Sequence, residues 1–302
     1  MTFTIKLKNE ISKQSDNSPE SLVSLAVFLK YNSTISDDIL SVHTENASVA
    51  RWLFKQIKSH YNIDIVLRSR VVNRFKKKTI YILEVKKKLN IIKSDIDNTM
   101  KNILDSSREE KIAFIKGLFL SSGSINDPAT SQYHLAFLVK DLNETKIATD
   151  VLVSLELNAK YIKRIREYMV YIKASEDIGD FINMMDAKEC LFYFEDIRIY
   201  KDHKNMVNRL NNCEQANVEK TLKTSKLVLD NIKYLEEHDL LDLLEGRTKD
   251  IAGYKKKYPD TSLAELANIV SLETGSSITK SGISHHIRRI NELADKHRNN
   301  TN

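Results

Sequence analysis

The first 190 or so residues contain a weak internal repeat, and this repeat constrains the fold more than any other feature of the chain. In each half, a helix, two strands, a second helix and two further strands follow one another, and one more helix comes after the last strand. Two such halves, related by a pseudo-twofold axis, predict an α+β fold with two curved sheets. The stretches that carry the prediction are Pro19–Tyr31 (helix), Ser36–His43 (strand) and a helix capped by Asn46 in the first half, and a helix with a Ser107–Glu110 capping box, the strand Tyr133–Val139 and the helix Leu142–Leu157 in the second.

The composition indicates a folded protein of the cytoplasm. Only 7 Gly and 3 Pro occur among 302 residues, which favours long helices and strands over open loops. No stretch is apolar enough to span a membrane, and the N-terminus lacks the pattern of a secretory signal. The two cysteines, Cys190 and Cys213, have no CxxC spacing and no nearby histidine pair, so reduced thiols are expected and no metal or cofactor is predicted.

Positive charge is concentrated in one short segment of the chain. Ten Lys and Arg residues and one acid, Glu84, lie between Arg68 and Lys93. They alternate with apolar stretches such as "TIYIL", a pattern that predicts a β-hairpin with a charged tip. Such a basic ribbon fits the major groove of double-stranded DNA, and a plain solvated surface is the alternative interpretation. The residues predicted to contact phosphates are Arg68, Arg70, Arg74, Lys76, Lys77 and Lys78.

The C-terminal stretch has the proportions of a helix-turn-helix. Thr261 or Ser262 caps a short helix, a turn that carries Gly275 follows, and a longer helix begins near Thr279. Opposite its apolar stripe, the second helix carries short polar and basic side chains, the kinds that contact base edges and phosphates. An ordinary helical hairpin with a charged outer face is the alternative. The residues predicted to bind DNA are Ser262, Lys280, Ser281, Ser284, His285, Arg288 and Arg289.

Four segments are predicted along the chain. Residues 1–105 and 106–190 form the two repeats, residues 191–235 form a helical linker, and residues 236–302 form the helix-turn-helix domain. The polar run Tyr200–Gln215 has no clear periodicity and predicts a flexible boundary between the repeats and the helical tail.

The helix of the second repeat is similar to a known nuclease helix that has lost its acid. Ile115–Gly123, "IKGLFLSSG", resembles the LAGLIDADG helix of homing endonucleases, in which an acid before the final Gly holds the catalytic metal ions. Ser122 stands at that position here, and Asn32 stands there in the first repeat. Neither side chain can replace a carboxylate at a divalent cation, so the protein is predicted not to be an enzyme. Small residues at 117 and 121 (Gly117 and Ser121) are predicted to let the two repeat helices pack closely.

Three stretches in the right order resemble the WhiA family of bacterial DNA-binding regulators. They are "IKGLFLSSGSINDPATSQYHLAF", "VNRLNNCEQANVEKT" and "SLAELANIV" followed by "ITKSGISHHIRRINELA"; the start "TFTIKLKNEIS" is also similar to that of the family. The resemblance covers essentially the whole chain. It implies a degenerate homing-endonuclease domain joined to a C-terminal helix-turn-helix. It also implies roles in transcription control, in sporulation in some actinobacteria, and in cell division or chromosome segregation elsewhere.

Three classes of function follow from these features. The leading interpretation is a non-catalytic regulator on the nucleoid, with double-stranded DNA and a further transcription or division protein as partners and no membrane. A chromosome-organising or protein-interaction scaffold with weak, nonspecific DNA binding is the alternative. An active homing endonuclease would require acids at Asn32 and Ser122, and the nearest acids, Glu109 and Glu110, lie at the wrong end of the helix.

Overall fold

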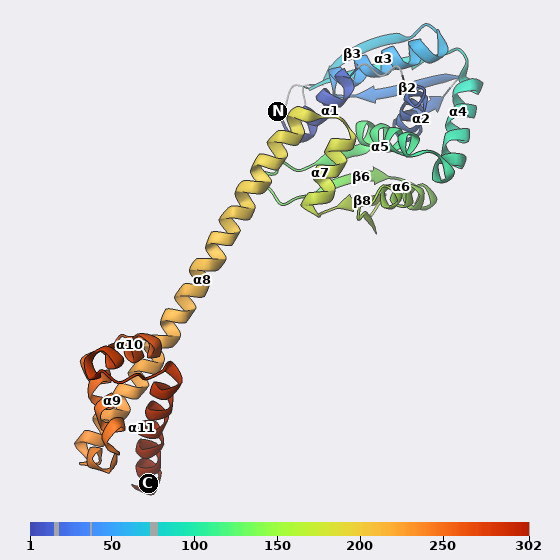
Figure 1. Ribbon diagram of the computed structural model, residues 1–302. Helices are drawn as coiled ribbons and strands as arrows, with labels where there is room; N and C mark the ends of the chain where they lie inside the picture. The colour runs from blue at the N-terminus through green and yellow to red at the C-terminus, as the bar shows by residue number, and fades with distance from the viewer. Residues whose placement is uncertain (15–17, 37, 73–77, 302) are drawn as a thin grey trace. The chain divides into compact units, whose positions relative to one another are not determined.

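The computed structural model describes residues 1–14, 18–36, 38–72 and 78–301 of the chain, which forms two compact units, Met1–Asp202 and His203–Asn302. Figure 1 labels the elements of each unit. Each unit has its own hydrophobic core.

The first repeat folds into one four-stranded antiparallel sheet with its helices. The strand order is β1-β2-β4-β3. The prediction of a single strand over Ser36–His43 is wrong, because the first strand ends at Ser36 and the second begins at Ile39. Asp38 has a left-handed backbone (φ 55°), which suits a chain reversal between them. The elements are α1 (Phe3–Lys13), α2 (Ser21–Asn32), β1 (Ser33–Ser36), β2 (Ile39–Thr44), α3 (Ala47–Tyr61), β3 (Val66–Val72), β4 (Lys78–Val85), α4 (Leu89–Asn102) and the 3-10 turn Ile103–Asp105.

The second repeat has the same topology. Its strands take the order β5-β6-β8-β7, the counterpart of the order in the first sheet, and the predicted α+β architecture of two repeats is confirmed. The expected capping box of Ser107 and Glu110 opens its first helix. The elements are α5 (Arg108–Ser122), β5 (Gly123–Ile125), β6 (Leu135–Val139), α6 (Leu142–Ser154), β7 (Lys160–Lys163), β8 (Tyr168–Ile172) and α7 (Ser175–Met184).

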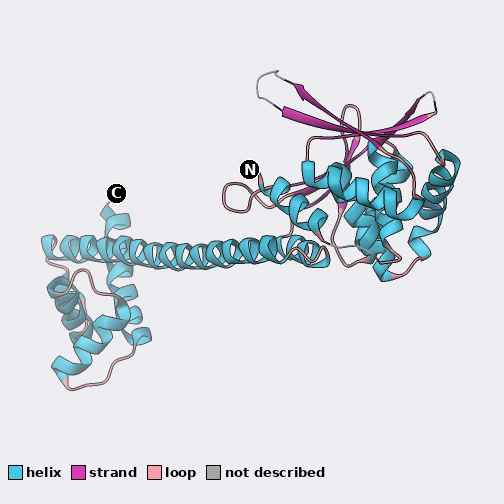
Figure 2. Ribbon diagram, turned by 90° about the horizontal axis from the view of Figure 1, so that it is seen from above, coloured by secondary structure: helices cyan, strands magenta, loops and turns pink. Residues whose placement is uncertain are grey.

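The helices of this unit lie along one side of the sheets, and the opposite side of each sheet is open to solvent (Figure 2). The strands explain this arrangement, because alternate residues point to opposite faces of a sheet. On β4, Leu83 and Val85 are fully buried against the helices, whereas Ile80 and Ile82 face the other way and are only half-buried. The outer face is therefore the one free to meet a partner.

Helix α1 is an element that the sequence patterns did not predict. It packs against α3 of the first repeat and also contacts β5 and α5 of the second. The Thr4 hydroxyl donates to the Ile125 carbonyl (2.7 Å) and accepts from the Ile125 N–H (2.9 Å). The Glu10 carboxylate accepts from the backbone N–H groups of Glu189 and Cys190, at 2.7 and 3.0 Å. These two N–H groups lie in the first turn of helix α8, where they have no partner within the helix. Glu10 of α1 therefore caps α8 from a different element.

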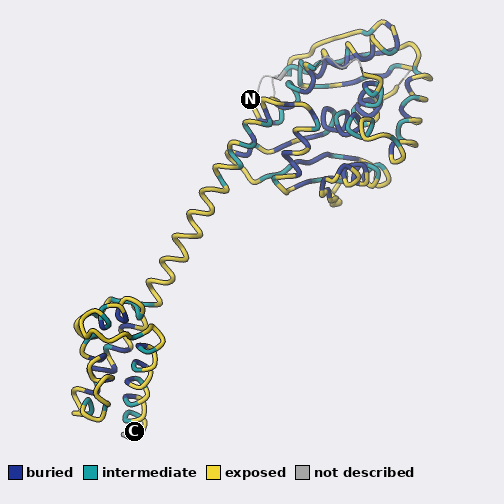
Figure 3. Tube along the Cα trace, viewed as in Figure 1, coloured by how far each residue is buried: buried dark blue, intermediate teal, exposed yellow. Residues whose placement is uncertain are grey.

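Helix α8 spans Lys188–Glu237, 50 residues without a break. The run Tyr200–Gln215, predicted as a flexible boundary, contains the division between the two units after Asp202, but it is helical along its whole length. No Gly or Pro occurs anywhere in α8, so nothing in the backbone chemistry ends the helix there. Every residue from Asp202 to Lys220 is exposed (Figure 3).

The second unit packs three helices against the end of α8. Ile232, Leu266 and Ile290 are fully buried in its core, which shares no side chain with the first core among the described residues. Ser262 forms a capping box with Glu265, and Gly275 ends the first helix of the pair with φ 65°, as the turn requires. The elements are a 3-10 turn (Leu241–Leu243), α9 (Gly246–Lys257), α10 (Leu263–Thr274) and α11 (Lys280–Thr301).

Candidate nucleic-acid interface

Helices α10 and α11 form the predicted helix-turn-helix, and local hydrogen bonds hold the turn between them. The Ser271 hydroxyl accepts from the Ile278 N–H (3.0 Å) and donates to the Ile278 carbonyl (3.3 Å). The Thr279 hydroxyl accepts from the Gly282 N–H (3.2 Å) at the start of α11. The start of α11 is therefore fixed relative to α10, which a helix that reads a DNA groove requires.

The outer face of α11 carries the predicted DNA-binding residues, and all six of them are exposed. The Arg288 guanidinium lies 3.3 Å from the carboxylate of Glu292, one turn further along the same helix, and the two side chains are about two-thirds exposed. Such a surface ion pair is weak and readily exchanged for another anion. The six residues are Lys280, Ser281, Ser284, His285, Arg288 and Arg289.

Arg289 and His286 connect α11 to α9. The Arg289 guanidinium lies 2.8 Å from the Glu245 carboxylate just before α9. The ring of His286 hydrogen-bonds to the buried Thr248 hydroxyl at 2.9 Å, and burial, together with His285 and nearby arginines, lowers the pKa of His286. The neutral ring therefore belongs to the packing side of α11, while its neighbour His285 is on the open side.

Ser262, the remaining predicted residue, lies at the first turn of α10 beside Lys280. Both line a cavity of about 390 Å³ between α10, α11 and the end of α8. Lys255 also lines it; the ammonium group donates to the carbonyls of Pro259 and Thr261, and burial lowers its pKa. The Ser262 hydroxyl accepts from the Glu265 N–H, so its contact within this structure is a helix cap.

The predicted basic hairpin is formed by β3 and β4. Arg68 lies opposite Ile82 and Arg70 lies opposite Ile80, so both arginines are on the outer face of the sheet and exposed. Arg68 approaches Glu84 at 3.6 Å. Arg74, Lys76 and Lys77 lie outside the described residues, and of Lys78 only the backbone, in β4, is described.

The second repeat presents a basic hairpin at the equivalent place, which the sequence analysis missed. β7 is the edge strand that corresponds to β3, and Lys160 on it lies opposite Tyr171, on the outer face. The Arg164 N–H donates to the Glu167 carbonyl (2.7 Å) and closes the turn to β8. The stretch "KYIKRIR" shows the same alternation of basic and apolar residues as the first hairpin, but it is shorter. The exposed cations of this region are Lys160, Lys163, Arg164, Arg166 and Lys173.

His134 stacks on Tyr171 of this outer face, with ring centroids 5.9 Å apart. Burial, together with Lys173 and Arg164, lowers the pKa of His134. The imidazole is therefore neutral near pH 7 and serves as part of the sheet surface.

The two positions of the missing acids hold neutral side chains that bond to nearby carbonyls. The Asn32 amide donates to the His43 carbonyl (3.3 Å), and the Ser122 hydroxyl donates to the Leu118 carbonyl (3.5 Å). Beside Asn32, burial, together with Glu144 and Asp141, raises the pKa of Tyr31, so this phenol is also neutral. Within the described part of the chain, no group of three or more His, Cys, Asp or Glu side chains is placed to hold a metal ion.

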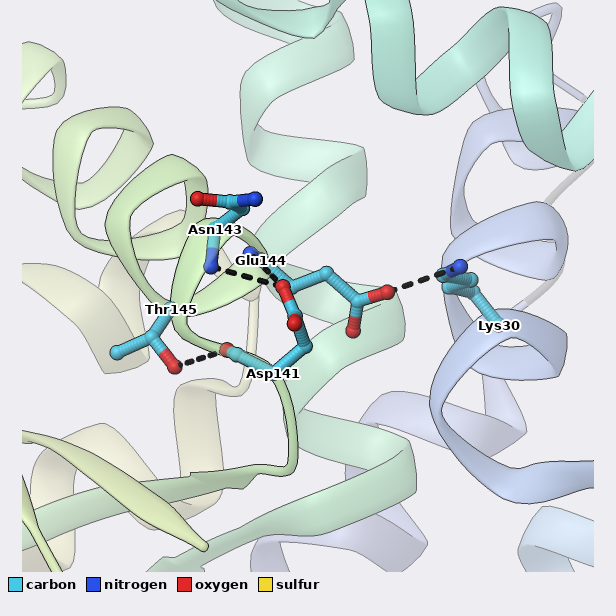
Figure 4. Close-up of polar contacts among 5 residues, drawn as sticks. All are labelled: Lys30, Asp141, Asn143, Glu144 and Thr145. Atoms are coloured by element: carbon cyan, nitrogen blue, oxygen red, sulfur yellow. Dashed lines mark hydrogen bonds and ion pairs between the residues drawn. The ribbon is translucent and has the colours of Figure 1, made fainter.

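Two residues before Asn32, Lys30 forms an ion pair at the junction of the two repeats. Figure 4 shows Lys30 of α2 reaching toward Glu144 in the first turn of α6, where their charged atoms are 2.9 Å apart. The Asp141 carboxylate accepts from the N–H groups of Asn143 and Glu144, at 2.8 and 3.1 Å, and so caps α6. Near the C-terminal end of α2, Glu144 is therefore paired with a lysine, and Asp141 accepts hydrogen bonds from backbone N–H groups.

Gly117 lies at the crossing of α2 and α5. A Cβ atom added to it would be 2.3 Å from the Ser24 carbonyl oxygen and 3.0 Å from Cβ of Val27, the residue aligned with Gly117 in the first repeat. The Ser24 hydroxyl donates to the Ala113 carbonyl across the same crossing (2.9 Å). Ser121, the other predicted packing residue, donates to the Leu118 carbonyl of its own helix (2.8 Å).

Two further sequence expectations concern the thiols and membrane spans. Cys190 is buried and Cys213 is exposed, both as free thiols, and burial and the nearby Glu10 raise the pKa of Cys190 to about 12. No helix in the described ranges has the length and apolar character that crossing a membrane demands.

Three family models match the chain in order. They are the "WhiA N-terminal LAGLIDADG-like domain" at residues 20–97, the "WhiA LAGLIDADG-like domain" at residues 111–204 and the "WhiA C-terminal HTH domain" at residues 207–294. The last match includes the second half of α8, which the predicted segment 236–302 leaves out.

Relatives and solved structures agree with these matches. The chain is 36% identical to the "Probable cell division protein WhiA" of Exiguobacterium sibiricum, covering 99% of this chain and 98% of the relative. It is 33% identical to the protein of the same description from Staphylococcus aureus, again over 99% and 98%. The crystal structure of full-length DUF199/WhiA from Thermotoga maritima has the same fold, with a TM-score of 0.58 at 21% identity over 98% of this chain and 99% of that one.

Proposed function

The chain belongs to the WhiA family, and from this premise we propose that it binds double-stranded DNA without cutting it and regulates the transcription of genes for cell division and chromosome segregation. The observation that carries the proposal is the helix-turn-helix, whose second helix exposes Lys280, Ser281, Ser284, His285 and Arg288 at and beyond its start. Hydroxyl, imidazole and guanidinium groups at this end of a recognition helix are donors that base edges and phosphates accept.

The two basic hairpins supply a second kind of contact. Arg68, Arg70 and Lys160 lie on outer sheet faces, where cations bind phosphates irrespective of the sequence of bases. The sheets thus contribute affinity, and α11 contributes the choice of sequence.

The test is DNase footprinting on fragments of the source genome, followed by binding measurements on one protected site and on random duplex. We expect a few sharp sites. Arg288→Ala should weaken binding to the preferred site by about 1–3 kcal/mol and binding to random duplex much less. Lys296→Ala, an exposed cation near the other end of α11, is the matched control and should change neither.

The hairpin variant should behave differently from the α11 variant. Replacing both Arg68 and Arg70 with Ala should weaken binding to both duplexes alike, and it should flatten the plot of log K against log salt by up to about 0.9 per lost phosphate contact. Uniform protection of all fragments, with a specificity ratio unchanged by Arg288→Ala, would favour the scaffold over the regulator.

A separate test addresses the absence of cutting. Supercoiled and linear duplex incubated with Mg²⁺ or Mn²⁺ should stay intact, because Asn32 and Ser122 offer no carboxylate to a cation. The matched control is the double variant Asn32→Ala, Ser122→Ala. Nicking that is present in the wild type and lost in this variant would contradict the proposal, whereas nicking by both preparations identifies a contaminant.

A further inference from the structure

The cavity beside the helix-turn-helix has a lining of one charge. It has a volume of about 390 Å³, which is in the range of pockets that hold small molecules. Lysines from three helices line it: Lys220 of α8, Lys255 of α9 and Lys280 of α11. No Asp or Glu is among the described residues that line it. The cavity therefore presents positive charge that no carboxylate in its walls offsets.

Other lysines of the second unit are paired with acids. Lys249 and Lys257, for example, lie 2.5 and 3.1 Å from the carboxylates of Asp242 and Glu273. In the described part of the chain, none of the three lysines of the cavity forms such an ion pair. Their ammonium groups are therefore available to an anion that comes from outside the chain.

Lys255 is the most informative of the three, because it is only 2% exposed. Its ammonium group donates to the carbonyls of Pro259 and Thr261, at 2.9 and 2.8 Å, which uses two of its three N–H groups. Asp260 and Glu265 act on it only as more distant charges. A buried charge is costly unless it is paired, so an anion in the cavity would complete the environment of this group.

The start of α10 adds donors to the same cavity. The Ser262 hydroxyl accepts from the Glu265 N–H (3.3 Å), so its own proton can be donated to a ligand. Leu263 and Ala264 also line the cavity, and their N–H groups lie in the first turn, where the helix supplies no acceptor. Such N–H groups favour a phosphate, and here they occur together with a buried ammonium group.

Part of the cavity wall is apolar. Val228 and Ile287, which are 1% and 5% exposed, line it together with the lysines. A backbone phosphate of DNA would engage the lysines but bring no apolar group to these side chains. We propose that the cavity binds a small phosphate ester whose organic part is apolar or aromatic, with the phosphate on the three lysines and the organic part against Val228 and Ile287.

The ligand would compete with DNA, and this part of the proposal rests on the proposed function. Lys280 and Ser262 are among the residues proposed to bind DNA, and a ligand phosphate on Lys280 would take its charge away from the duplex. The coupling is reciprocal, so DNA would weaken ligand binding by the same factor. Ligand binding itself requires no DNA, and it is therefore tested first on the full chain alone.

The first experiment is calorimetric titration with three probes. 1-Naphthyl phosphate carries both the phosphate and the aromatic group, 1-naphthol only the aromatic group, and inorganic phosphate only the charge. We expect one site per chain for 1-naphthyl phosphate, and binding at least about tenfold weaker for each of the other two, because each lacks one of the two kinds of contact. A wild type that does not bind 1-naphthyl phosphate, or that binds either simpler probe as tightly, would overturn the proposal.

A pair of double variants locates the site. Lys220→Gln with Lys280→Gln should weaken binding of 1-naphthyl phosphate about tenfold or more, because two charged contacts are lost. Lys223→Gln with Lys296→Gln is the matched control: it removes the same charge from the same two helices at residues that do not line the cavity, and it should bind as the wild type does. All four lysines are exposed, so circular dichroism should show that both variants keep their helix content. Equal affinities in the two double variants would contradict the site.

The competition is measured by the fluorescence anisotropy of a labelled duplex at constant ionic strength. Saturating 1-naphthyl phosphate should weaken DNA binding several-fold in the wild type and in the control pair, and it should have no effect on the variant that lacks Lys220 and Lys280. Unchanged DNA affinity in the wild type with the probe bound would overturn the competition. Loss of DNA binding in every preparation without the probe would count against the proposed function, whereas the calorimetric result decides the site by itself.

Discussion

Gly117 is the residue on which the approach of the two central helices depends most. Its Cα faces the backbone of α2 so closely that a methyl group has no room beside the Ser24 carbonyl oxygen. Alanine is the better helix former by about 1 kcal/mol, so a helix would gain from Ala at this position if nothing lay against it. Packing at the crossing therefore overrides helix propensity.

We predict that Gly117→Ala lowers the free energy of unfolding of the first unit by about 1–3 kcal/mol, because one of the two backbones must shift. The readout is the fluorescence of Trp52, the only tryptophan, during urea unfolding. Gly179→Ala is the matched control. Its added Cβ would come close to the carboxylate of Glu195, the far end of a flexible side chain, and would lie at ordinary contact distance from the Phe194 ring, so its effect should be small. Equal losses in the two variants would contradict the prediction.

Lys8 carries a charge in a place where water is scarce. Its ammonium group donates to the Leu120 carbonyl at 3.1 Å and lies 5.6 Å from the centre of the Phe119 ring. Burial lowers the pKa of Lys8 from 10.5 to about 8. The folded chain thus releases this proton at a lower pH than the unfolded chain does.

The sign of the pH dependence follows from that difference. Between pH 8 and pH 9 the unfolded chain binds more protons at Lys8, so the free energy of unfolding should rise with pH. We predict that the free energy of unfolding of the wild type rises by up to about 1 kcal/mol between these two pH values, relative to that of Lys8→Met, as measured by urea unfolding. Parallel changes in the two proteins would show that Lys8 titrates normally. The comparison cancels the opposite contribution of Cys190, whose raised pKa lowers stability as pH rises.

Among the elements, α1 and α8 are joined by a contact that spans nearly 180 residues of chain. A helix begins with N–H groups that have no partner of their own, and a carboxylate that accepts from them also interacts favourably with the helix dipole. Glu10 supplies this carboxylate to α8, while α1 packs against α3 of the first repeat and bonds to β5 of the second. One N-terminal helix therefore stabilises both the second sheet and the start of the long helix.

We predict that Glu10→Ala destabilises the first unit by about 1–2 kcal/mol, the usual effect of removing a helix cap. Asp196→Ala is the control. It removes an exposed carboxylate from α8, beyond the first turn of that helix, and should change the stability little. Hydrogen exchange should locate the effect of Glu10→Ala in the first turn of α8. Unchanged exchange at Glu189 and Cys190 would show that the cap does not hold these N–H groups.

On the scale of the whole molecule, the two units have separate cores. Ile182 and Ile290 are both fully buried, one in each core, and no described side chain belongs to both clusters. A substitution that creates a cavity in one core therefore removes no contact from the other core.

Calorimetry should therefore resolve two unfolding transitions. Ile290→Ala should lower the free energy of unfolding of the second unit by about 2–5 kcal/mol and shift only the transition of that unit. Ile182→Ala should shift only the transition of the first unit. The two variants serve as each other's control. A single transition that both substitutions move would show that the units unfold together.

Much of the fold was predictable because its signals are local. Periodicity of apolar residues marks the repeat helices and strands, and the caps at Asn46 and Ser107 mark where two helices begin. The neutral residues at 32 and 122, and the outer face of α11, could be identified for the same reason. The long helix α8 was predicted only in part, because its exposed polar stretch carries no apolar stripe of the kind that marks a core helix.

The amino-acid sequence by itself determined the order of the elements, the lost acids and the basic composition of the surfaces. Only the tertiary structure decided that α1 caps α8, that Gly117 lies against Ser24, that Arg289 turns to Glu245, and that two basic hairpins occupy equivalent edges of two sheets. The physical reason is range. Caps and periodicities act within a few residues along the chain, whereas these contacts join segments that approach only when the two repeats and the helices have packed.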